Sequence, residues 1–335
     1  MLSPSIEPPK WLRGGHAETI WAARCAAPAP VAALGPRWQR ERWTSPDGDF
    51  VDVDSQWGIP GQPHVVMFHG LEGSSESHYA RAWAHATCVH GWTLRVVHFR
   101  GCSGEINRAP RAYHSGDAAE LDWILRACAR QAAQDPLCAI GVSLGGNALV
   151  KWLGTLALEP SAPSLVAAAA IAAPLDLQAA GMAIEQGMNR WLYTPMFLRT
   201  MHEKARAKWA QFPGLFDLER VKRAKTIREF DDAFTAPLHG FKDVWDYWAR
   251  ASGKPQLSSV SIPTWVINAQ NDPFVPVASV IGDVRPSGEV RVWQPAAGGH
   301  AGFVHQDAQS PWRGGLWYLP LALIDWFDME VSKHG

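Results

Sequence analysis

The chain has 335 residues, and 47% of them are hydrophobic, which is enough to bury a sizeable core in one large domain or two ordinary ones. Its 31 basic and 32 acidic residues give a net charge of -1, which excludes a chain-wide electrostatic field toward nucleic acid or anionic lipid. We therefore expect no nucleic-acid partner and favour a small or uncharged one.

The cysteines and the apolar stretches bear on where the protein works. Five cysteines form no CxxC pair and do not resemble a disulfide framework, which favours a reducing, cytoplasmic location. Residues 1–10 contain proline, serine and glutamate and do not form the basic and apolar regions of a signal peptide. The longest nearly apolar run, residues 165–175, is too short for a bilayer span, which takes about 20 residues. We expect a soluble protein.

Short apolar segments alternate with longer helix-like segments, which is typical of parallel strands joined by crossover helices. Asp117 followed by Glu120 forms a capping box that predicts the start of one helix, and the last helix is expected at 317–331. Residues 42–55 alternate in polarity and predict antiparallel edge strands. Apolar strands that helices cover on both faces are predicted at 64–68, 93–99, 137–142, 165–172, 264–268 and 289–293.

One interval breaks the alternation. About 90 residues separate the strand ending near Ala172 from the strand starting at Thr264, where a single helix would be usual. We interpret residues 175–256 as an inserted, mainly helical cap, and residues 1–174 and 257–335 as the core domain. The insert is rich in methionine and aromatic residues, which either form its own core or line a pocket for an apolar substrate; examples are Met196, Phe197, Met201 and Trp209.

The sequence Gly141-Val142-Ser143-Leu144-Gly145 is a G-x-S-x-G motif between an apolar strand and a helix-compatible stretch, residues 146–156. This placement predicts a nucleophile elbow, a turn so sharp that side chains two residues either side of the serine would collide with it. The turn exposes the Ser143 hydroxyl, and the helix N-terminus beneath it favours a developing anion.

A serine hydroxyl needs a base to take its proton and a third group to orient that base. Asp272 follows the strand at 264–268, and His300 follows the next strand in a glycine-rich loop, so both lie where sites of α/β sheets are assembled. We predict Ser143 as nucleophile, His300 as base and Asp272 as the orienting acid. Asp176, after the preceding strand, is the alternative acid.

The tetrahedral intermediate also needs two N–H donors. We predict the backbone N–H of Leu144 and, from the loop His69-Gly70-Leu71-Glu72-Gly73, that of Leu71. His69 is interpreted as structural. Cys102 lacks a strand-elbow-helix context and is interpreted as a structural cysteine. No HExxH or CxxC occurs in the sequence, so we expect neither a metal nor a cofactor.

Several motifs beyond the elbow resemble one family. With them, the stretch from about Gly14 to Phe327 resembles the YheT-like esterases of the AB hydrolase 4 family. The motifs are Gly15-His16, Thr19-Ile20, Ser77-His78-Tyr79, Arg100-Gly101-Cys102-Ser103-Gly104, His114-Ser115-Gly116-Asp117, Phe230-Asp231-Asp232, Thr235-Ala236-Pro237, Gly240-Phe241, Asn271-Asp272-Pro273 and Gly298-Gly299-His300-Ala301-Gly302-Phe303. His98 departs from the family, which more often has asparagine there.

The resemblance implies the α/β-hydrolase fold, the triad of Ser143, Asp272 and His300, and carboxylesterase or acylglycerol lipase chemistry. We therefore expect an enzyme that cleaves a small-molecule ester with an apolar acyl chain through an acyl-enzyme. An acyltransferase or a small-substrate peptidase would use the same triad. A binding protein that kept the fold and lost catalysis is the alternative from another class, and the intact triad argues against it.

Overall fold

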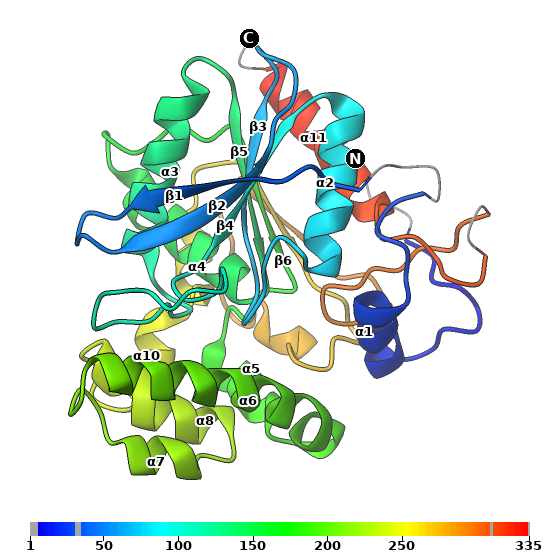
Figure 1. Ribbon diagram of the computed structural model, residues 1–335. Coiled ribbons are helices and arrows are strands. Elements are labelled where there is room, and N and C mark those ends of the chain that lie inside the picture. The colour runs from blue at the N-terminus through cyan, green and yellow to red at the C-terminus, as the bar shows by residue number, and fades with distance from the viewer. Residues whose placement is uncertain (1–5, 31–34, 309–310, 334–335) are drawn as a thin grey trace.

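The computed structural model describes residues 6–30, 35–308 and 311–333 (Figure 1). The prediction that residues 1–10 form no signal peptide and the outer limits of the core domain therefore fall partly on residues outside these ranges.

Within the described residues, eight strands form one sheet in the order β1-β2-β4-β3-β5-β6-β7-β8. β1 pairs with β2 and β2 with β4 in antiparallel fashion, and all the other pairs are parallel. The predicted mostly parallel sheet with antiparallel edge strands is confirmed. The strands are β1 Gln39–Thr44, β2 Phe50–Gln56, β3 His64–Phe68, β4 Thr93–His98, β5 Leu137–Val142, β6 Ala167–Ile171, β7 Thr264–Ile267 and β8 Val290–Trp293.

Helices cover both faces of the sheet because its central strands are apolar on both sides. In β3, Val65 and Met67 face α2 and α11, whereas Val66 and Phe68 face α3 and α4. Figure 1 shows these two helical layers on opposite sides of the sheet. Their bounds are α2 His78–His90, α3 Ala118–Ala132, α4 Leu144–Leu153 and α11 Tyr318–Val331, and a further helix, α1 Gly15–Arg24, precedes the sheet.

The interval between β6 and β7 is helical. We call residues 175–256 the cap; it lies below the sheet in Figure 1 and contains two apolar clusters, built around Phe230 and Trp248. Its elements are α5 Leu177–Ile184, α6 Gly187–Gln211, α7 Leu218–Arg223, α8 Ile227–Phe230, a π-helical turn Asp231–Thr235, α9 Ala236–Leu238, α10 Val244–Ala251 and the start of a 3-10 helix Lys254–Ser258.

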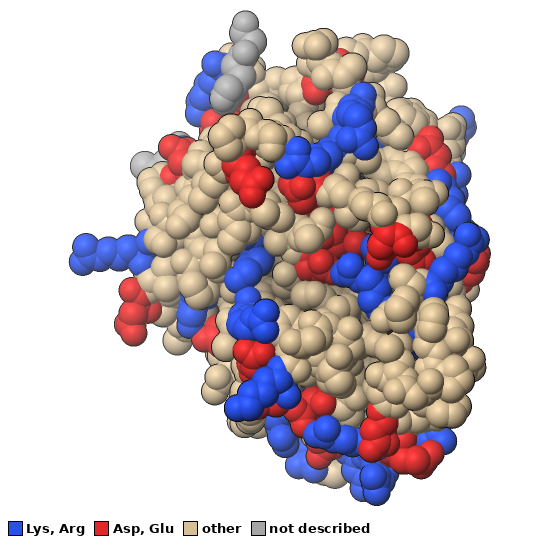
Figure 2. Space-filling model, turned by 90° about the vertical axis from the view of Figure 1, so that its left-hand side faces the viewer, with Lys and Arg blue, Asp and Glu red and all other residues tan. Residues whose placement is uncertain are grey.

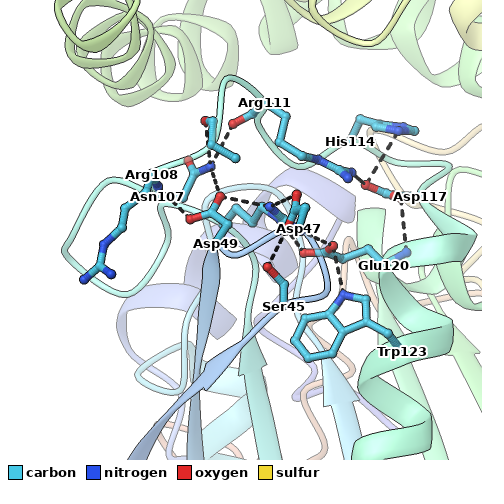
Figure 3. Close-up of polar contacts among 12 residues, drawn as sticks. Ser45, Asp47, Asp49, Asn107, Arg108, Arg111, His114, Asp117, Glu120 and Trp123 are labelled. Carbon is cyan, nitrogen blue, oxygen red and sulfur yellow. Dashed lines mark hydrogen bonds and ion pairs between the residues drawn. The ribbon is translucent and has the colours of Figure 1, made fainter.

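The predicted capping box is only half formed. The Asp117 side chain accepts a hydrogen bond from the N–H of Glu120 and caps α3. The Glu120 carboxylate does not return this bond, because both of its oxygens accept from the buried Arg100 guanidinium. Asp47 and Asp49 bind the same guanidinium, so three carboxylates surround one cation at the edge of the sheet (Figure 3).

The surface carries mixed charge on the face shown in Figure 2. Basic and acidic side chains are interspersed there over the core and the cap, and neither sign dominates that face. Among the described residues, no helix is both long and apolar enough to cross a membrane.

Candidate active site

Ser143 lies in the turn between β5 and α4 with φ 52° and ψ -120°, a backbone conformation that residues other than glycine rarely adopt. The turn is held by a 2.8 Å hydrogen bond from the Ser143 N–H to Ile171 O. A Cβ on Gly145 would lie 2.3 Å from Phe68 O, and a Cβ on Gly141 would lie 2.4 Å from Gly145 O. Glycine is therefore needed at both positions, but the clash is with neighbouring backbone and not with the serine.

The structure brings Ser143, His300 and Asp272 together. His300 Nε2 lies 2.9 Å from Ser143 Oγ, and its Nδ1 lies 2.9 Å from Asp272 Oδ2. The Asp272 side chain is fully buried, and its Oδ1 accepts hydrogen bonds from the N–H groups of Phe274 and Val275. A carboxylate held in this way fixes the histidine tautomer that leaves Nε2 free to accept the serine proton.

Helix α1 supports the loops that follow β7 and β8. Glu18 accepts one hydrogen bond from Gly298 N–H at 2.5 Å and another from the Asn271 side chain at 3.0 Å. Thr19 Oγ1 accepts a 2.9 Å hydrogen bond from the N–H of His300 itself. Both α1 side chains are buried, so the position of the histidine depends on this helix.

Sequence reasoning missed this role of α1. The Gly15-His16 and Thr19-Ile20 motifs contribute to the family resemblance but do not by themselves indicate a function. A Cβ on Gly15 would lie 1.7 Å from Asn271 O, so glycine at this position lets the helix approach the acid loop. Glu18 gave no signal of its own, because an acidic residue in the first turn of a helix is common.

The backbone N–H groups of the loop after β3 can be assigned one by one. Gly70 N–H donates to Tyr79 OH at 3.0 Å, and Glu72 N–H donates to Tyr113 OH at 3.1 Å. The N–H of Leu71, between them, donates to no group in the described chain. The free donor is thus the one that the sequence predicts for an oxyanion hole.

Leu144 N–H, at the first position of α4, also has no acceptor within the described residues, and Leu71, Leu144 and Ser143 line the same cavity. His69 stabilises the loop from beneath. Its Nδ1 contacts Gly70 O at 2.7 Å, and its Nε2 accepts from Phe99 N–H at 3.1 Å. Burial lowers the pKa of His69 to about 3, so the ring is neutral and structural.

The cavity above Ser143 has a volume of about 380 Å³, within the range of small-molecule sites. Trp209 does not line it and packs within the cap's own apolar cluster, so the expectation that it offers surface to a substrate is not supported. The apolar lining from α1 and the cap includes Ile20, Leu177, Ile184, Met196, Phe197 and Met201.

Asp231 is a cavity residue that sequence reasoning did not identify as such. It lines the cavity from the π-helical turn, and its carboxylate accepts from Thr235 Oγ1 at 2.7 Å and Trp248 Nε1 at 3.0 Å. Burial raises the pKa of Asp231 to about 6. Asp231 was part of the resemblance, but a motif alone does not show which way a side chain points.

The other candidates lie apart from the triad. Asp176 caps α5 and pairs with Lys254 at 2.5 Å, and no contact with His300 is present in the described structure. Burial raises the pKa of the Cys102 thiol to about 11, so it is no thiolate nucleophile at neutral pH. His98, the residue at which this chain departs from the family, contacts Asp54 Oδ2 through its Nε2 at 2.8 Å. The described residues contain no group of three or more His, Cys, Asp or Glu side chains placed to hold a metal.

Comparisons with known proteins show the family to which the chain is similar. A family model described as the alpha/beta hydrolase fold matches residues 63–305. The chain is 38% identical over 274 residues to the Escherichia coli K12 protein named "Putative esterase YheT", covering 80% of this chain and 79% of that one. It is 31% identical over 349 residues to Phospholipase ABHD3 of Mus musculus, covering 100% of this chain and 80% of the other.

A solved structure supports the fold alone. The Pyrococcus furiosus esterase Pf2001 superposes with a TM-score of 0.53 at 15% sequence identity, covering 91% of this chain and 98% of that chain. At such low identity the agreement concerns the arrangement of strands and helices and carries no argument about substrate.

Proposed function

The chain belongs to the α/β-hydrolase fold family, among the YheT-like esterases, and from this premise we propose that it cleaves carboxylic esters through an acyl-enzyme on Ser143. The observation that carries the proposal is the contact series from Ser143 Oγ through His300 to Asp272, with both distances at 2.9 Å. Such a series is what activation of a serine hydroxyl requires.

In the first half of the reaction, Ser143 Oγ attacks the ester carbonyl carbon while His300 Nε2 takes the hydroxyl proton. Asp272 holds the His300 Nδ1–H and stabilises the imidazolium that forms. The carbonyl oxygen becomes an oxyanion that accepts hydrogen bonds from Leu71 N–H and Leu144 N–H. When the tetrahedral intermediate collapses, the bond to the alcohol breaks and His300 returns its proton to the leaving oxygen.

In the second half, water attacks the acyl-enzyme with His300 again acting as base. The acid leaves, and Ser143 regains its proton. The apolar lining of the cavity supports a substrate with an apolar acyl chain. The position of the cap, which contributes Met196, Phe197 and Met201 to that lining, supports our proposal that it covers Ser143 and selects the acyl group.

A fluorophosphonate probe and a chain-length series of aryl esters test this function together. We expect the probe to label Ser143, and we expect Ser143→Ala to abolish both labelling and hydrolysis. A native protein that resists the probe, or a Ser143→Ala variant that still hydrolyses the esters, contradicts a serine mechanism.

We also propose a cytoplasmic location. All five cysteines are free thiols in the structure, which suits a reducing compartment. Fractionation of the source cells, with the protein detected in the cytoplasmic fraction, tests it.

A further inference from the structure

Glu72 has an unusual backbone conformation directly beside the predicted oxyanion donor. Its φ is +57°, in the left-handed region that residues other than Gly, Asn and Asp rarely adopt. Glu72 directly follows Leu71, so the turn at Glu72 anchors the C-terminal end of the short segment that carries the free Leu71 N–H. A strained residue of this kind persists only when its surroundings hold it.

Two side chains hold Glu72, one from the core and one from the cap. Tyr113 OH accepts from Glu72 N–H at 3.1 Å and donates to Glu72 Oε1 at 2.7 Å. Lys204, on cap helix α6, donates to the same Oε1 at 2.7 Å. The oxyanion loop is therefore bonded to a segment of the chain that lies 132 residues away in sequence.

Lys204 remains a cation at this position. Burial by itself lowers the pKa of Lys204, but hydrogen bonds and charge interactions with its neighbours outweigh burial, and the pKa is raised above its ordinary value. Cys102 Sγ accepts a 3.1 Å hydrogen bond from Lys204 but is protonated at neutral pH, since burial raises its pKa to about 11. The Glu72 carboxylate is thus the anion that Lys204 pairs with.

The same face of α6 contacts the core and the substrate cavity. Met201 lines the cavity one turn before Lys204, and Lys208 follows one turn after it. The buried Lys208 donates to the carbonyl oxygens of Asn107 at 2.7 Å and Ala109 at 2.8 Å. The Asn107 side chain in turn donates to a carboxylate of the network around the Arg100 guanidinium (Figure 3). This second anchor fixes the height of the helix above the loop.

We propose that Lys204 is a positioning residue for ester hydrolysis that, through Glu72, holds Leu71 N–H in the oxyanion hole. The docking of helix α6 on the core then determines how well the oxyanion of the transition state is stabilised. The inference rests on the proposed function, since it assigns a support to that same site. It makes the cap part of the catalytic apparatus and not only a wall of the cavity.

The test compares Lys204→Met with a matched control, Lys254→Met. Lys254 also forms an ion pair, with Asp176, where the two ends of the cap meet, and its side chain is similarly exposed, 24% against 27% for Lys204. We would measure kcat and KM for an aryl ester, and Ki for a trifluoromethyl ketone. Ser143 adds to the ketone carbon of this inhibitor, and the resulting oxyanion occupies the oxyanion hole.

Lys204→Met is expected to lower kcat about ten-fold, less than the 10²- to 10³-fold loss on removing an oxyanion donor, because the donor is displaced and not deleted. KM should change less than two-fold, and the Ki should rise about as much as kcat/KM falls. Lys254→Met should leave all three quantities near their wild-type values. Thermal unfolding shows whether both variants are folded at the assay temperature.

A second variant, Glu72→Gln, keeps the proposal testable if Lys204→Met does not fold. Gln keeps the shape of Glu72 but weakens the bond to Lys204, so kcat should fall with little change in KM. In the double variant the two losses should not multiply, because both changes break one contact.

The inference is overturned if Lys204→Met and Glu72→Gln change kcat and Ki no more than Lys254→Met does, or if their losses multiply. Failure of the proposed function looks different. In that case the wild-type protein itself would neither hydrolyse the esters nor bind the ketone, whatever residue stands at position 204.

Discussion

Helices α1 and α6 lie outside the central sheet and support opposite halves of the active site with different chemistry. Helix α1 holds the histidine loop with the Glu18 carboxylate and the Thr19 hydroxyl, both buried acceptors of backbone or amide hydrogen bonds. Helix α6 contacts the oxyanion loop through the ion pair between Lys204 and Glu72, in which both side chains keep some exposure, and through the apolar cluster of the cap, against which Leu71 packs.

The difference separates two tasks. A buried carboxylate with several donors is a rigid support that breaks only when the local fold opens. A partly exposed ion pair is weaker and depends on the position of the helix that carries it. The base is therefore fixed by the core, whereas the oxyanion loop is tied to the cap, whose helix α6 also lines the cavity with Met201.

The largest expected effect is that of removing a triad residue, which gives the lowest kcat against which the other variants are compared. Ser143→Ala and His300→Ala should each lower kcat by ~10⁴-fold or more, because triad members act as a unit. Asp272→Asn should also be severe, since it disturbs the tautomer of His300. Steady-state hydrolysis of an aryl ester measures all three.

Asp176→Asn is the control for the acid. It should leave kcat near the wild-type value, because Asp176 caps α5 and pairs with Lys254. If Asp176→Asn lowers kcat severely and Asp272→Asn leaves it nearly unchanged, the acid is assigned wrongly.

The elbow was predictable because its signals are local. Gly141, Ser143 and Gly145 lie within five residues, and each is required by the same turn. The strands before the triad residues were predicted to within two residues of their observed limits, since an apolar run between polar turns specifies a buried strand. Order along the chain then assigned the acid and the base.

The supports were not predictable because their contacts span long distances in sequence. Glu18 and Gly298 are 280 residues apart, and Glu72 and Lys204 are 132 residues apart. Neither pair leaves a periodic or spaced pattern in the sequence. Cap composition was equally ambiguous: Met201 lines the cavity and Trp209 does not, although both are apolar residues of the same helix.

The next largest effect is expected where α1 supports the His300 loop. Glu18→Ala leaves Gly298 N–H and the Asn271 amide without their acceptor, which should cost about 1–3 kcal/mol of unfolding free energy. A His300 loop displaced by this loss should also lower kcat, by roughly 10- to 100-fold. Denaturant unfolding and kcat at a temperature where the variant is folded measure the two effects.

Glu330→Gln is the control, because Glu330 is buried to a similar degree but lies on α11. It should lower kcat far less than Glu18→Ala. Combining Glu18→Ala with Lys204→Met sharpens the comparison: if the two helices support separate halves, their losses in kcat should multiply. A combined loss no larger than one single loss would mean that α1 and α6 act through one shared movement.

The regions also differ in how stability responds to pH. In the core, the Arg100 guanidinium and neighbouring hydrogen bonds outweigh burial and lower the pKa of Asp47 to about 2, so this pairing is weakened only in strong acid. In the cap, burial raises the pKa of Asp231 from 3.8 to about 6. The folded protein therefore binds this proton more tightly than the unfolded chain does, and ionised Asp231 opposes folding above about pH 6.

Asp231→Asn should relieve that opposition. Asn can still accept from Trp248 Nε1 and can donate to Thr235 Oγ1, so the contacts remain while the charge is gone. We expect the variant to gain up to about 3 kcal/mol over wild type at pH 7–8, with the gain declining below pH 6 and absent near pH 4. Denaturant unfolding of both proteins across this range measures it. An equal difference at pH 8 and pH 4 would contradict a buried charge at this position.

The smallest expected effect concerns the part of α6 that lines the cavity. Met201→Ala removes apolar contact from the cavity wall and makes room for a longer acyl chain. Each substrate methylene that the cavity buries contributes up to ~0.8 kcal/mol, or about four-fold in kcat/KM. The chain-length optimum should therefore lengthen by one or two carbons. Met188→Ala is the matched control, because Met188 lies on the same helix but is 55% exposed and outside the cavity lining. If Met201→Ala instead raises the Ki of the trifluoromethyl ketone without moving the optimum, Met201 supports the docking of Lys204, and acyl selectivity arises elsewhere in the cavity.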